Sequence, residues 1–276
     1  MKTILNTRSL LKISGSDAET FLQSQLSNDI SKLNNTQAQL NAYCQHQGKI
    51  ISLFWVMRYD GSFLLSFPAD LAEKVTARLQ MFVIMSDVSI ENVSGQLIQI
   101  GLKNESHPNA YSINDNLSLI VDSFGEINTD LNVDCNREWT KACIDSKIPE
   151  VFLSSSEKFV PQMLNLDIDE VGVSFSKGCY PGQEVVARLH YLGEAKRRLF
   201  AFKSDFEMQV GDSLYCASSK AAKARGDRYK GSGIVVNSVK YNSVFYCLAT
   251  LDIDLLDSII TLNNKHGPIL KIINNE

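Results

Sequence analysis

The chain has 276 residues, more than a single hydrophobic core usually serves, so two or three domains are expected. Hydrophobic residues make up 44% of it and charged residues 21%, which is typical of a globular protein and excludes a disordered chain. The net charge of -4 excludes a protein that binds nucleic acid mainly through bulk positive charge.

The six cysteines show no C-x-x-C or His–Cys spacing of the kind that holds zinc, so no metal site is expected. The N-terminus has no sustained apolar core of the secretory type, which favours reduced thiols over a disulfide framework. The apolar runs are too short to span a bilayer, and the run from Ile50 to Met57 has only strand length. The sequence therefore predicts a cytoplasmic protein that does not enter the membrane.

The first half of the chain mixes strand and helix patterns. Residues 10–13 predict a short strand, and Ser16 with Glu19 three positions later matches a capping box, so a helix is expected to begin there. The pair Asp60-Gly61 is a strong hairpin signal. Further strands are expected over residues 38–45, 50–59, 62–67, 87–93, 96–102 and 116–122, and further helices over residues 68–85 and 136–146.

One thiol stands between two glycines in the segment Lys177–Glu184. Apolar residues at 185, 189 and 192 predict one buried face of a helix that follows, so Cys179 is expected just ahead of that helix. A lone cysteine is more often a small buried hydrophobe than a reactive group. The two glycines favour the reactive interpretation, because they permit unusual backbone torsions or the close approach of another group.

Positive charge is expected around this thiol. Pro181 suits the first helical position, and the free amides of that turn carry partial positive charge that stabilises a thiolate. Lys177 and Arg188 would add to it. Glu184 lies four residues before Arg188, in the order that favours an ion pair on the helix surface.

From residue 197 the pattern changes to short alternating strands with glycine or asparagine turns. They are expected over residues 197–204, 211–217, 231–239, 243–251, 258–262 and 268–273. Six such strands indicate a small barrel or sandwich. Five cations fall in one predicted hairpin of this region: Lys220, Lys223, Arg225, Arg228 and Lys230. A charged run is usually just solvated, and an RNA or partner surface is the alternative.

The segment Lys177–Glu184 resembles the signature of the YgfZ family, relatives of the glycine-cleavage T-protein. Phe159–Leu166 resembles the family's lead-in to that signature, and Gly193–Leu199 resembles its exit into the last domain. Phe21–Asp29 resembles the family pattern F-L-Q-x-Q-x-x-x-D, although a solvated helix face would read the same way. Together the three central segments cover about forty contiguous residues.

The resemblance implies an α+β fold with two parts. The first is a T-protein-like folate-binding body of two interleaved α/β subdomains, expected over residues 1–195. The second is a C-terminal β-barrel, expected over residues 196–276. The implied cofactor is tetrahydrofolate or a derivative, which needs an apolar slot for its rings and cations for its glutamate tail.

The resemblance also implies site residues. It places the turn Gln47-Gly48-Lys49 beside the folate cavity and Trp139 at a folate-associated position, for which a core position is the equal alternative. Arg8 or Ser9 stands where the family has another such tryptophan. The residues expected to bind the cofactor are Trp139, Gln47, Lys49, Gly182, Gln183 and Glu184, and those expected to be catalytic are Cys179, Lys177 and Arg188. Gln183 and Glu184 are expected to act mainly by fixing the loop.

The function implied by the resemblance is that of a folate-binding factor that supports the assembly or repair of iron–sulfur proteins and thereby tRNA modification. The expected partner is an iron–sulfur protein such as a tRNA-thiolating enzyme, and no direct DNA binding is expected. Cys179 could act as a nucleophile, a redox thiol or an iron ligand. An accessory role is favoured over that of a turnover enzyme.

Two other functions stay open. The first is a folate-dependent aminomethyltransferase of the T-protein class in which Cys179 is incidental, although no segment here matches the acidic residue that assists transfer in those enzymes. The second is an interaction protein that binds RNA or a partner through the barrel and its basic hairpin. Substrate-dependent formation of methylene-tetrahydrofolate would identify the first. Loss of binding on neutralising Lys220, Lys223 and Arg225 would identify the second.

Overall fold

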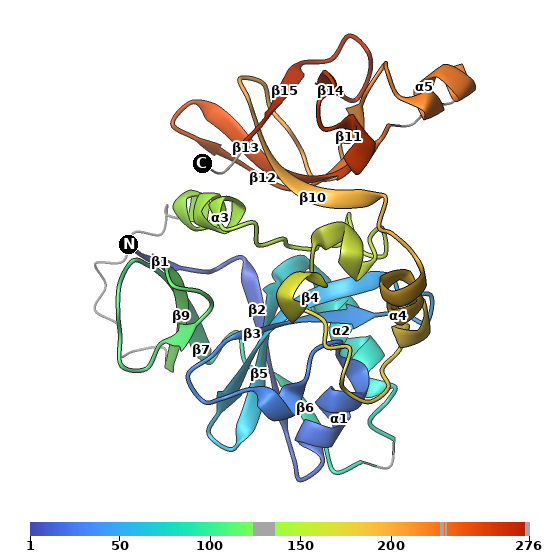
Figure 1. Ribbon diagram of the computed structural model, residues 1–276. Helices are drawn as coiled ribbons and strands as arrows, with labels where there is room; N and C mark the ends of the chain where they lie inside the picture. The colour runs from blue at the N-terminus through green and yellow to red at the C-terminus, as the bar shows by residue number, and fades with distance from the viewer. Residues whose placement is uncertain (85, 124–135, 227–228, 230, 274–276) are drawn as a thin grey trace.

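The structure is a computed structural model that describes residues 1–84, 86–123, 136–226, 229 and 231–273. Within this part of the chain the strands form a five-stranded sheet, a four-stranded sheet and a closed barrel (Figure 1). The two sheets belong to the body of the molecule, and the barrel lies above them in Figure 1. No helix in the described ranges is both long enough and apolar enough to cross a membrane.

The five-stranded sheet is antiparallel and holds most of the first 92 residues. Its strands, in spatial order, are β3 (Gln39–Cys44), β4 (Ile50–Tyr59), β5 (Ser62–Pro68), β2 (Arg8–Ser14) and β6 (Ser89–Asn92). The predicted hairpin between β4 and β5 is confirmed, and both Asp60 and Gly61 adopt the positive φ that such a two-residue turn requires. Two helices lie against this sheet, α1 (Ala18–Gln25) and α2 (Ala72–Gln80), and the short helical turns η1 (Ile30–Lys32) and η2 (Ala69–Leu71) flank them.

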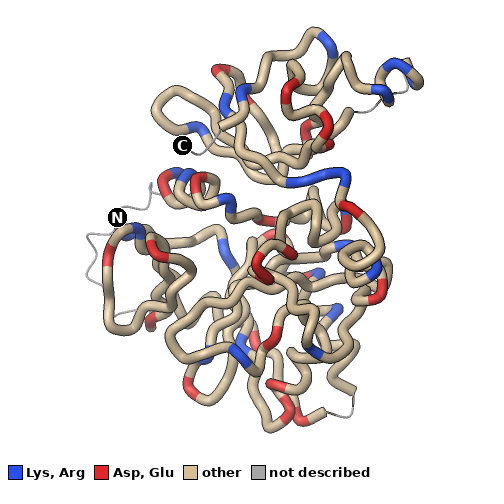
Figure 2. Tube along the Cα trace, viewed as in Figure 1, with Lys and Arg blue, Asp and Glu red and all other residues tan. Residues whose placement is uncertain are grey.

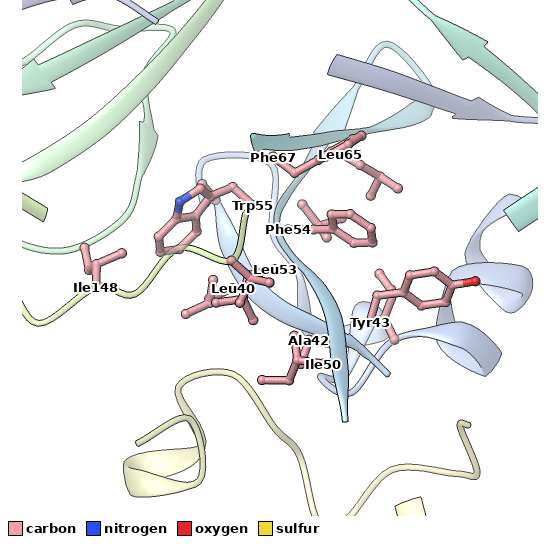
Figure 3. Close-up of a cluster of buried hydrophobic side chains, with 14 of the residues drawn as sticks. Leu40, Ala42, Tyr43, Ile50, Leu53, Phe54, Trp55, Leu65, Phe67 and Ile148 are labelled. Atoms are coloured by element: carbon pink, nitrogen blue, oxygen red, sulfur yellow. The ribbon is translucent and has the colours of Figure 1, made fainter. Parts of the chain in front are cut away.

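Side chains of β4 alternate between the two faces of this sheet, as the pleat requires. Phe54 packs with Tyr43 and Phe67, with ring centroids 5.8 and 5.2 Å away. The next residue, Trp55, points to the other side, where it lies near Ile148 (Figure 3). The sheet is therefore buried on both faces, and its core continues into the segment that follows α3.

The four-stranded sheet interleaves with the first one. Its order is β1 (Lys2–Ile4), β7 (Leu97–Lys103), β9 (Leu117–Ser123) and β8 (Tyr111–Ser112). The chain enters this sheet with β1, crosses to the other sheet with β2, and returns only with β7, so the two subdomains share one N-terminal segment. The helix α3 (Asn136–Asp145) packs between β1 and β7 of this sheet and two strands of the barrel.

The C-terminal strands close into the barrel that the alternation predicted. Their order is β10 (Arg197–Ser204), β13 (Val244–Asp252), β12 (Gly233–Tyr241), β11 (Ser213–Tyr215), β14 (Ile260–Leu262) and β15 (Ile269–Ile272), with β15 pairing back to β10. The turn η7 (Ile253–Leu255) follows β13. The barrel has its own buried cluster around Phe202, Val235 and Leu251. Closure leaves no free sheet edge, which suits so small a domain.

Two ion pairs hold the segment that joins body and barrel. Figure 2 shows a run of cations where the chain enters β10. Arg197 pairs with Asp252 of the barrel at 2.9 Å, and Arg198 donates to both carboxylate oxygens of Asp167 in the body. The amide of Asn165 also donates to the carbonyl of Leu199 at 3.0 Å. The connection is thus fixed to both parts of the molecule.

The helix α1 starts later than the capping box predicted. Its N-cap is Asp17 and its first residue is Ala18. The hydroxyl of Ser16 does not cap the helix, because it donates to the carboxylate of Asp87 at 2.8 Å. A residue distant in sequence thus competes for the side chain on which the prediction rested.

The helix that follows the cysteine loop is α4 (Gln183–Leu192), and its N-cap is Gly182. Pro181 therefore precedes the cap, and the prediction that it is the first helical residue is wrong. The predicted buried face is wrong as well, since Val185 and Leu192 are exposed while Val186 is buried. Val186 faces the body, where its carbonyl accepts a hydrogen bond from the amide of Gln162 in the short turn η4 (Pro161–Leu164).

The basic segment of the barrel contains a short helix, α5 (Lys220–Arg225), where a hairpin was predicted. Its N-cap is Ser219, whose hydroxyl accepts the amide N–H of Ala222 at 2.9 Å. Lys220, Lys223 and Arg225 are exposed on it. Arg228 and Lys230 of the predicted cluster lie outside the described residues.

Candidate functional site

Cys179 lies on an exposed loop between the turn η5 (Ile168–Glu170) and α4. Among the five cysteines that the structure describes, it alone is exposed; the other four, all buried, are Cys44, Cys143, Cys216 and Cys247. The sixth, Cys135, lies outside the described residues. The preceding Gly178 is exposed too, and a Cβ added there would meet no atom within 4 Å. The thiol is therefore open to another molecule.

Lys177 anchors the loop on its N-terminal side. Its side chain is buried, and its ammonium donates to the backbone carbonyls of Gln23 (2.6 Å), Leu26 (2.5 Å) and Asn28 (3.0 Å). An ammonium has three N–H donors, so all of them are engaged. Gln23 lies in the last turn of α1 and Leu26 is its C-cap, where unpaired carbonyls favour a cation, and Asn28 follows the helix. Lys177 therefore ties the signature loop to the segment that carries the F-L-Q-x-Q-x-x-x-D pattern.

This geometry corrects the role predicted for Lys177. Its ammonium is directed toward the end of α1 and has no proton left for a thiolate or a folate carboxylate. Burial lowers the pKa of Lys177 to about 8, against the attraction of the Asp29 carboxylate, which raises it. The charged form still prevails at neutral pH. Lys177 is thus a positioning residue, and Cys179 receives no hydrogen bond from it.

Tyr180 anchors the loop on the other side of Cys179. Its side chain is 6% exposed and lies beside the buried thiol of Cys44. Burial raises the pKa of its phenol well above the ordinary value, and the Cys44 thiol is a smaller cause of the same shift. The ammonium of Lys177 lies 5.4 Å from its ring centroid. Buried anchors therefore flank the exposed Gly178-Cys179 pair on both sides. The backbone that carries the thiol is held in place while the thiol itself faces solvent.

The start of α4 packs against the turn between β3 and β4. Gly182 has φ 84°, and a Cβ added there would lie 2.4 Å from the carbonyl oxygen of Gln45 and 2.7 Å from the Cα of Gly48. Gly48 also has positive φ, and its own added Cβ would lie 3.1 Å from the Cβ of Val185. The two glycines are required by this close contact of two backbones. It brings the predicted folate turn next to the predicted cysteine loop.

The polar residues predicted around this contact are exposed on its surface. Gln47 and Lys49 flank Gly48 on the turn, and Glu184 is exposed in the first turn of α4, where a carboxylate suits the helix dipole. The backbone N–H of Gln183 donates to the carbonyl of Tyr180 at 3.1 Å, which closes the loop. The loop-fixing contact of Gln183 is thus made by its backbone.

Arg188 lies on the exposed face of α4, one turn after Glu184. The predicted ion pair between these two residues is wrong: it is absent from the ion pairs that the described residues form. Each side chain is instead free to reach a ligand or a partner from the surface of the helix.

Trp139 lies in the core and not beside the cysteine loop. It is 5% exposed, and its ring covers the backbone of Gly101 in β7, where an added Cβ would come within 2.3 Å of the indole. Its helix α3 and the helix α4 lie on different sides of the body in Figure 1. The structure therefore does not bring Trp139 together with Gln47, Lys49 and the start of α4.

A buried ion pair occupies the place near the N-terminus where the family has its other tryptophan. The guanidinium of Arg8 pairs with Glu150, and it also donates to the hydroxyl of Ser66 at 2.8 Å and to its carbonyl at 3.0 Å. The hydroxyl of Ser66 in turn donates to the side-chain oxygen of Gln99. Sequence reasoning named Arg8 only as a replacement and missed this network, because Glu150 lies 142 residues away along the chain.

The residues present fit a folate in part. The amide of Gln47 and the ammonium of Lys49 suit the carboxylates of a folate tail. Trp139 does not suit the pterin ring, because its indole is packed against Gly101. The polar half of the predicted site is therefore available at the surface, and the predicted aromatic half is part of the core.

Two cavities border the connecting segment that leads into β10. Their volumes are about 570 and about 490 Å³, and Glu194, Ala195, Lys196 and Asp252 line both of them. Neither is lined by Cys179 or by a residue predicted to bind folate. The cysteine loop is thus a surface site rather than part of these cavities.

Comparison with known proteins gives relatives over most of the chain. A family model described as the GCVT N-terminal domain matches residues 5–112. An uncharacterized protein of Haemophilus influenzae is 29% identical over 255 residues, which cover 89% of this chain and 87% of that protein. The tRNA-modifying protein YgfZ of Vibrio atlanticus is 27% identical over 269 residues, with 87% and 80% covered, and that of Klebsiella pneumoniae is 28% identical over 251 residues, with 76% of each covered.

A solved structure shares the fold of the whole chain. The glycine cleavage system aminomethyltransferase T from Bartonella henselae superposes with a TM-score of 0.63 over 99% of this chain and 84% of that one. At 11% sequence identity this likeness concerns the fold alone. It confirms the predicted class, an α+β body of two interleaved subdomains followed by a β-barrel.

Proposed function

This chain belongs to the YgfZ family, and we propose that it is a tetrahydrofolate-binding factor that supports iron–sulfur proteins and thereby tRNA modification, with Cys179 as its reacting group. The observation that carries the proposal is the way the thiol is presented. Cys179 is exposed on a loop whose neighbours Lys177 and Tyr180 are buried and held. A structural cysteine would be buried, as the other four described cysteines are.

The chemistry of a held, exposed thiol suits this role. A thiolate can ligate iron, attack an oxidised sulfur or add to an aldehyde. Each reaction needs the sulfur atom to reach a group on another molecule. Because the backbone at Cys179 is already fixed, the entropic cost of ordering the loop in such an encounter is small. A cluster usually takes four thiolates, so a partner protein would supply the other ligands.

The folate part of the proposal rests on the surface beside the loop. Gln47 and Lys49 would hold the carboxylates of the tail, with Gly182, Gln183 and Glu184 at the start of α4 forming the adjoining backbone. When bound, tetrahydrofolate would supply the capacity to accept or carry a one-carbon unit near the thiol. The chain's own contribution is to orient the tail and to keep Cys179 accessible next to it.

The partner part of the proposal rests on the relatives. The proteins of Vibrio atlanticus and Klebsiella pneumoniae are named as tRNA-modifying, and we infer the same general role for this chain. The route we propose is indirect: an iron–sulfur protein in the cytoplasm, such as a tRNA-thiolating enzyme, is the partner, and this chain is an accessory factor to it. Direct binding of DNA has no part in this role.

Titration with tetrahydrofolate and its 5-formyl derivative tests the folate part. We expect the wild-type protein to bind in a saturable way, in the micromolar range, by calorimetry. The affinity of Lys49→Met should be roughly five- to tenfold weaker. The matched control Lys203→Met, which removes an exposed cation of the barrel, should keep the wild-type affinity. Absence of binding in the wild-type protein would overturn the folate assignment.

The same samples separate the proposal from the alternative aminomethyltransferase. An enzyme of that class would form methylene-tetrahydrofolate from an aminomethyl donor at a rate that Cys179→Ser leaves unchanged. Under the proposal, no such turnover is expected.

A further inference from the structure

Three cations from two separate elements surround one carboxylate beside the turn that carries Gly48. Lys74 and Arg78 lie four residues apart on α2, so they share one face of that helix. The ammonium of Lys74 donates to Glu157 at 2.6 Å and to the hydroxyl of Ser156 at 2.9 Å. Lys49, from the turn between β3 and β4, is exposed, and the backbone N–H of Glu157 donates to the carbonyl of the next residue, Ile50, at 2.7 Å.

The pKa of Glu157 reports the same surroundings. It lies below its ordinary value, first because of the hydrogen bond from Lys74 and then because of the positive charges of Lys74, Arg78 and Lys49, while burial opposes the shift. Three cations thus face a single carboxylate that is already paired with one of them. The local charge is positive although the chain as a whole carries -4.

Arg78 and Tyr43 hold unused donors at this place. The buried Nε of Arg78 has no hydrogen-bond partner among the described residues. The Cζ of Arg78 lies 6.0 Å from the ring centroid of Tyr43. Tyr43 is fully buried, and its hydroxyl is also without a partner. Figure 3 shows this hydroxyl pointing away from Trp55, out of the aromatic cluster.

An unpaired buried donor such as the Nε of Arg78 is costly, and the half-buried guanidinium that carries it is the group that best matches an oxyanion. We propose that Lys49, Lys74 and Arg78 form a binding site for a phosphate group, in which the guanidinium of Arg78 is the principal donor and the two lysines supply charge. The ring of Tyr43 borders the guanidinium of Arg78, whose Cζ is 6.0 Å from the ring centroid, and its hydroxyl makes no hydrogen bond to Arg78. The site takes a dianion because it offers two cations more than the carboxylate neutralises.

The position of this site gives it a use. Lys49 follows Gly48 directly, and Gly48 packs on Gly182 at the start of α4, so the phosphate site and the loop of Cys179 adjoin the same backbone contact. A phosphate-bearing ligand held by the three cations would therefore lie beside the loop that carries the thiol. The phosphate can belong to a small molecule or to the backbone of an RNA, and the chemistry of the site is the same for both.

The test is calorimetric titration of the full chain with inorganic phosphate and with pyrophosphate at low ionic strength. We expect binding in the millimolar range that weakens at least about tenfold in Arg78→Met and in Lys49→Met, and that is unchanged in Lys203→Met on the barrel. Lys49 is exposed, so its replacement leaves the fold intact even where Arg78→Met destabilises it. Absence of binding in the wild-type protein, or full binding in Lys49→Met and Arg78→Met, would overturn the proposal.

A second arm identifies the source of the phosphate. A short single-stranded RNA that competes with pyrophosphate and binds more tightly at low salt would assign the site to a polynucleotide. An RNA that fails to compete, while pyrophosphate still binds, would assign it to a small ligand. Cys179→Ser should bind phosphate as the wild-type protein does, so the outcome is independent of the function proposed for the thiol.

Discussion

The backbone of Gly182 lies directly against the backbone of Gly48: a Cβ on the first would fall 2.7 Å from the Cα of the second. This contact joins the loop of Cys179 to the turn that carries Gln47 and Lys49. It sets where α4 begins, because Gly182 is both the N-cap of that helix and the point of contact. The geometry of the candidate site therefore depends on two glycines far apart in the sequence.

Gly182→Ala should destabilise the protein. The substitution places a Cβ 2.4 Å from the carbonyl oxygen of Gln45 and forces an alanine into a positive φ, and we expect a loss of roughly 1–3 kcal/mol in the free energy of unfolding. Chemical denaturation measures it. Gly178→Ala is the matched control, because a Cβ there meets nothing within 4 Å. Equal stability of the two variants would contradict the described contact.

Lys177 should make stability depend on alkaline pH. Its pKa is about 8 in the folded protein, below the ordinary 10.5 that applies to the unfolded chain. Between these two pKa values the unfolded chain binds the proton and the folded chain does not. This group therefore raises the free energy of unfolding by roughly 1–3 kcal/mol as the pH rises from 8 to 10.5. Below pH 8 it does not change the free energy of unfolding with pH.

The measurement is the free energy of unfolding at about pH 7, 9 and 10 for the wild-type protein and for Lys177→Met. The variant has no group to titrate at this position, so the excess of the wild-type free energy of unfolding over that of the variant should grow with pH. The variant is expected to be less stable at every pH, since three carbonyls lose their donor. A difference that stays constant with pH would show that the pKa of Lys177 is not lowered.

Cys179 should react with a thiol reagent in the native state. Because Cys44, Cys143, Cys216 and Cys247 are buried, we expect iodoacetamide to modify Cys179 at least ~10-fold faster than any of these four. Peptide mass spectrometry after brief labelling measures the rates, and labelling of the unfolded chain is the control in which the five rates converge. Comparable native rates for Cys179 and Cys44 would remove the observation on which the proposed function rests.

The buried pair of Arg8 and Glu150 should be strongly coupled. Arg8→Met leaves the carboxylate of Glu150 buried without its partner, which should cost about 3–5 kcal/mol of stability. Replacing both residues, Arg8→Met with Glu150→Leu, should recover a large part of that loss. Denaturation of the single and double variants forms the cycle that measures the coupling. Additive losses would contradict the direct contact between the two side chains.

Local patterns predicted the parts of the fold that local physics decides. The alternation over residues 197–204 predicted β10 because strand period and side-chain burial are properties of neighbouring residues. The hairpin at Asp60-Gly61 followed from the positive φ that both residues accept. The helix α5 was missed although Ser219, followed by residues that favour a helix, was a readable N-cap signal.

The errors in the candidate site have a common physical cause. The start of α4 was misplaced at Pro181 because the true cap, Gly182, is fixed by Gly48 from another strand pair. The role of Lys177 was misassigned because its acceptors lie about 150 residues earlier in the chain. No pattern within one sequence contains such contacts. What the sequence could supply was the type of residue at each place: a thiol, its glycines and the polar turn.

The most direct test of the central claim is the level of thiolated tRNA in cells whose only copy of the protein carries Cys179→Ser. We expect this level to fall to that of cells without the protein. The melting temperature of the purified variant should stay within about 2 °C of the wild-type value, because the side chain of Cys179 is exposed. A normal level of thiolated tRNA in the presence of the variant would contradict the claim that Cys179 is the reacting group.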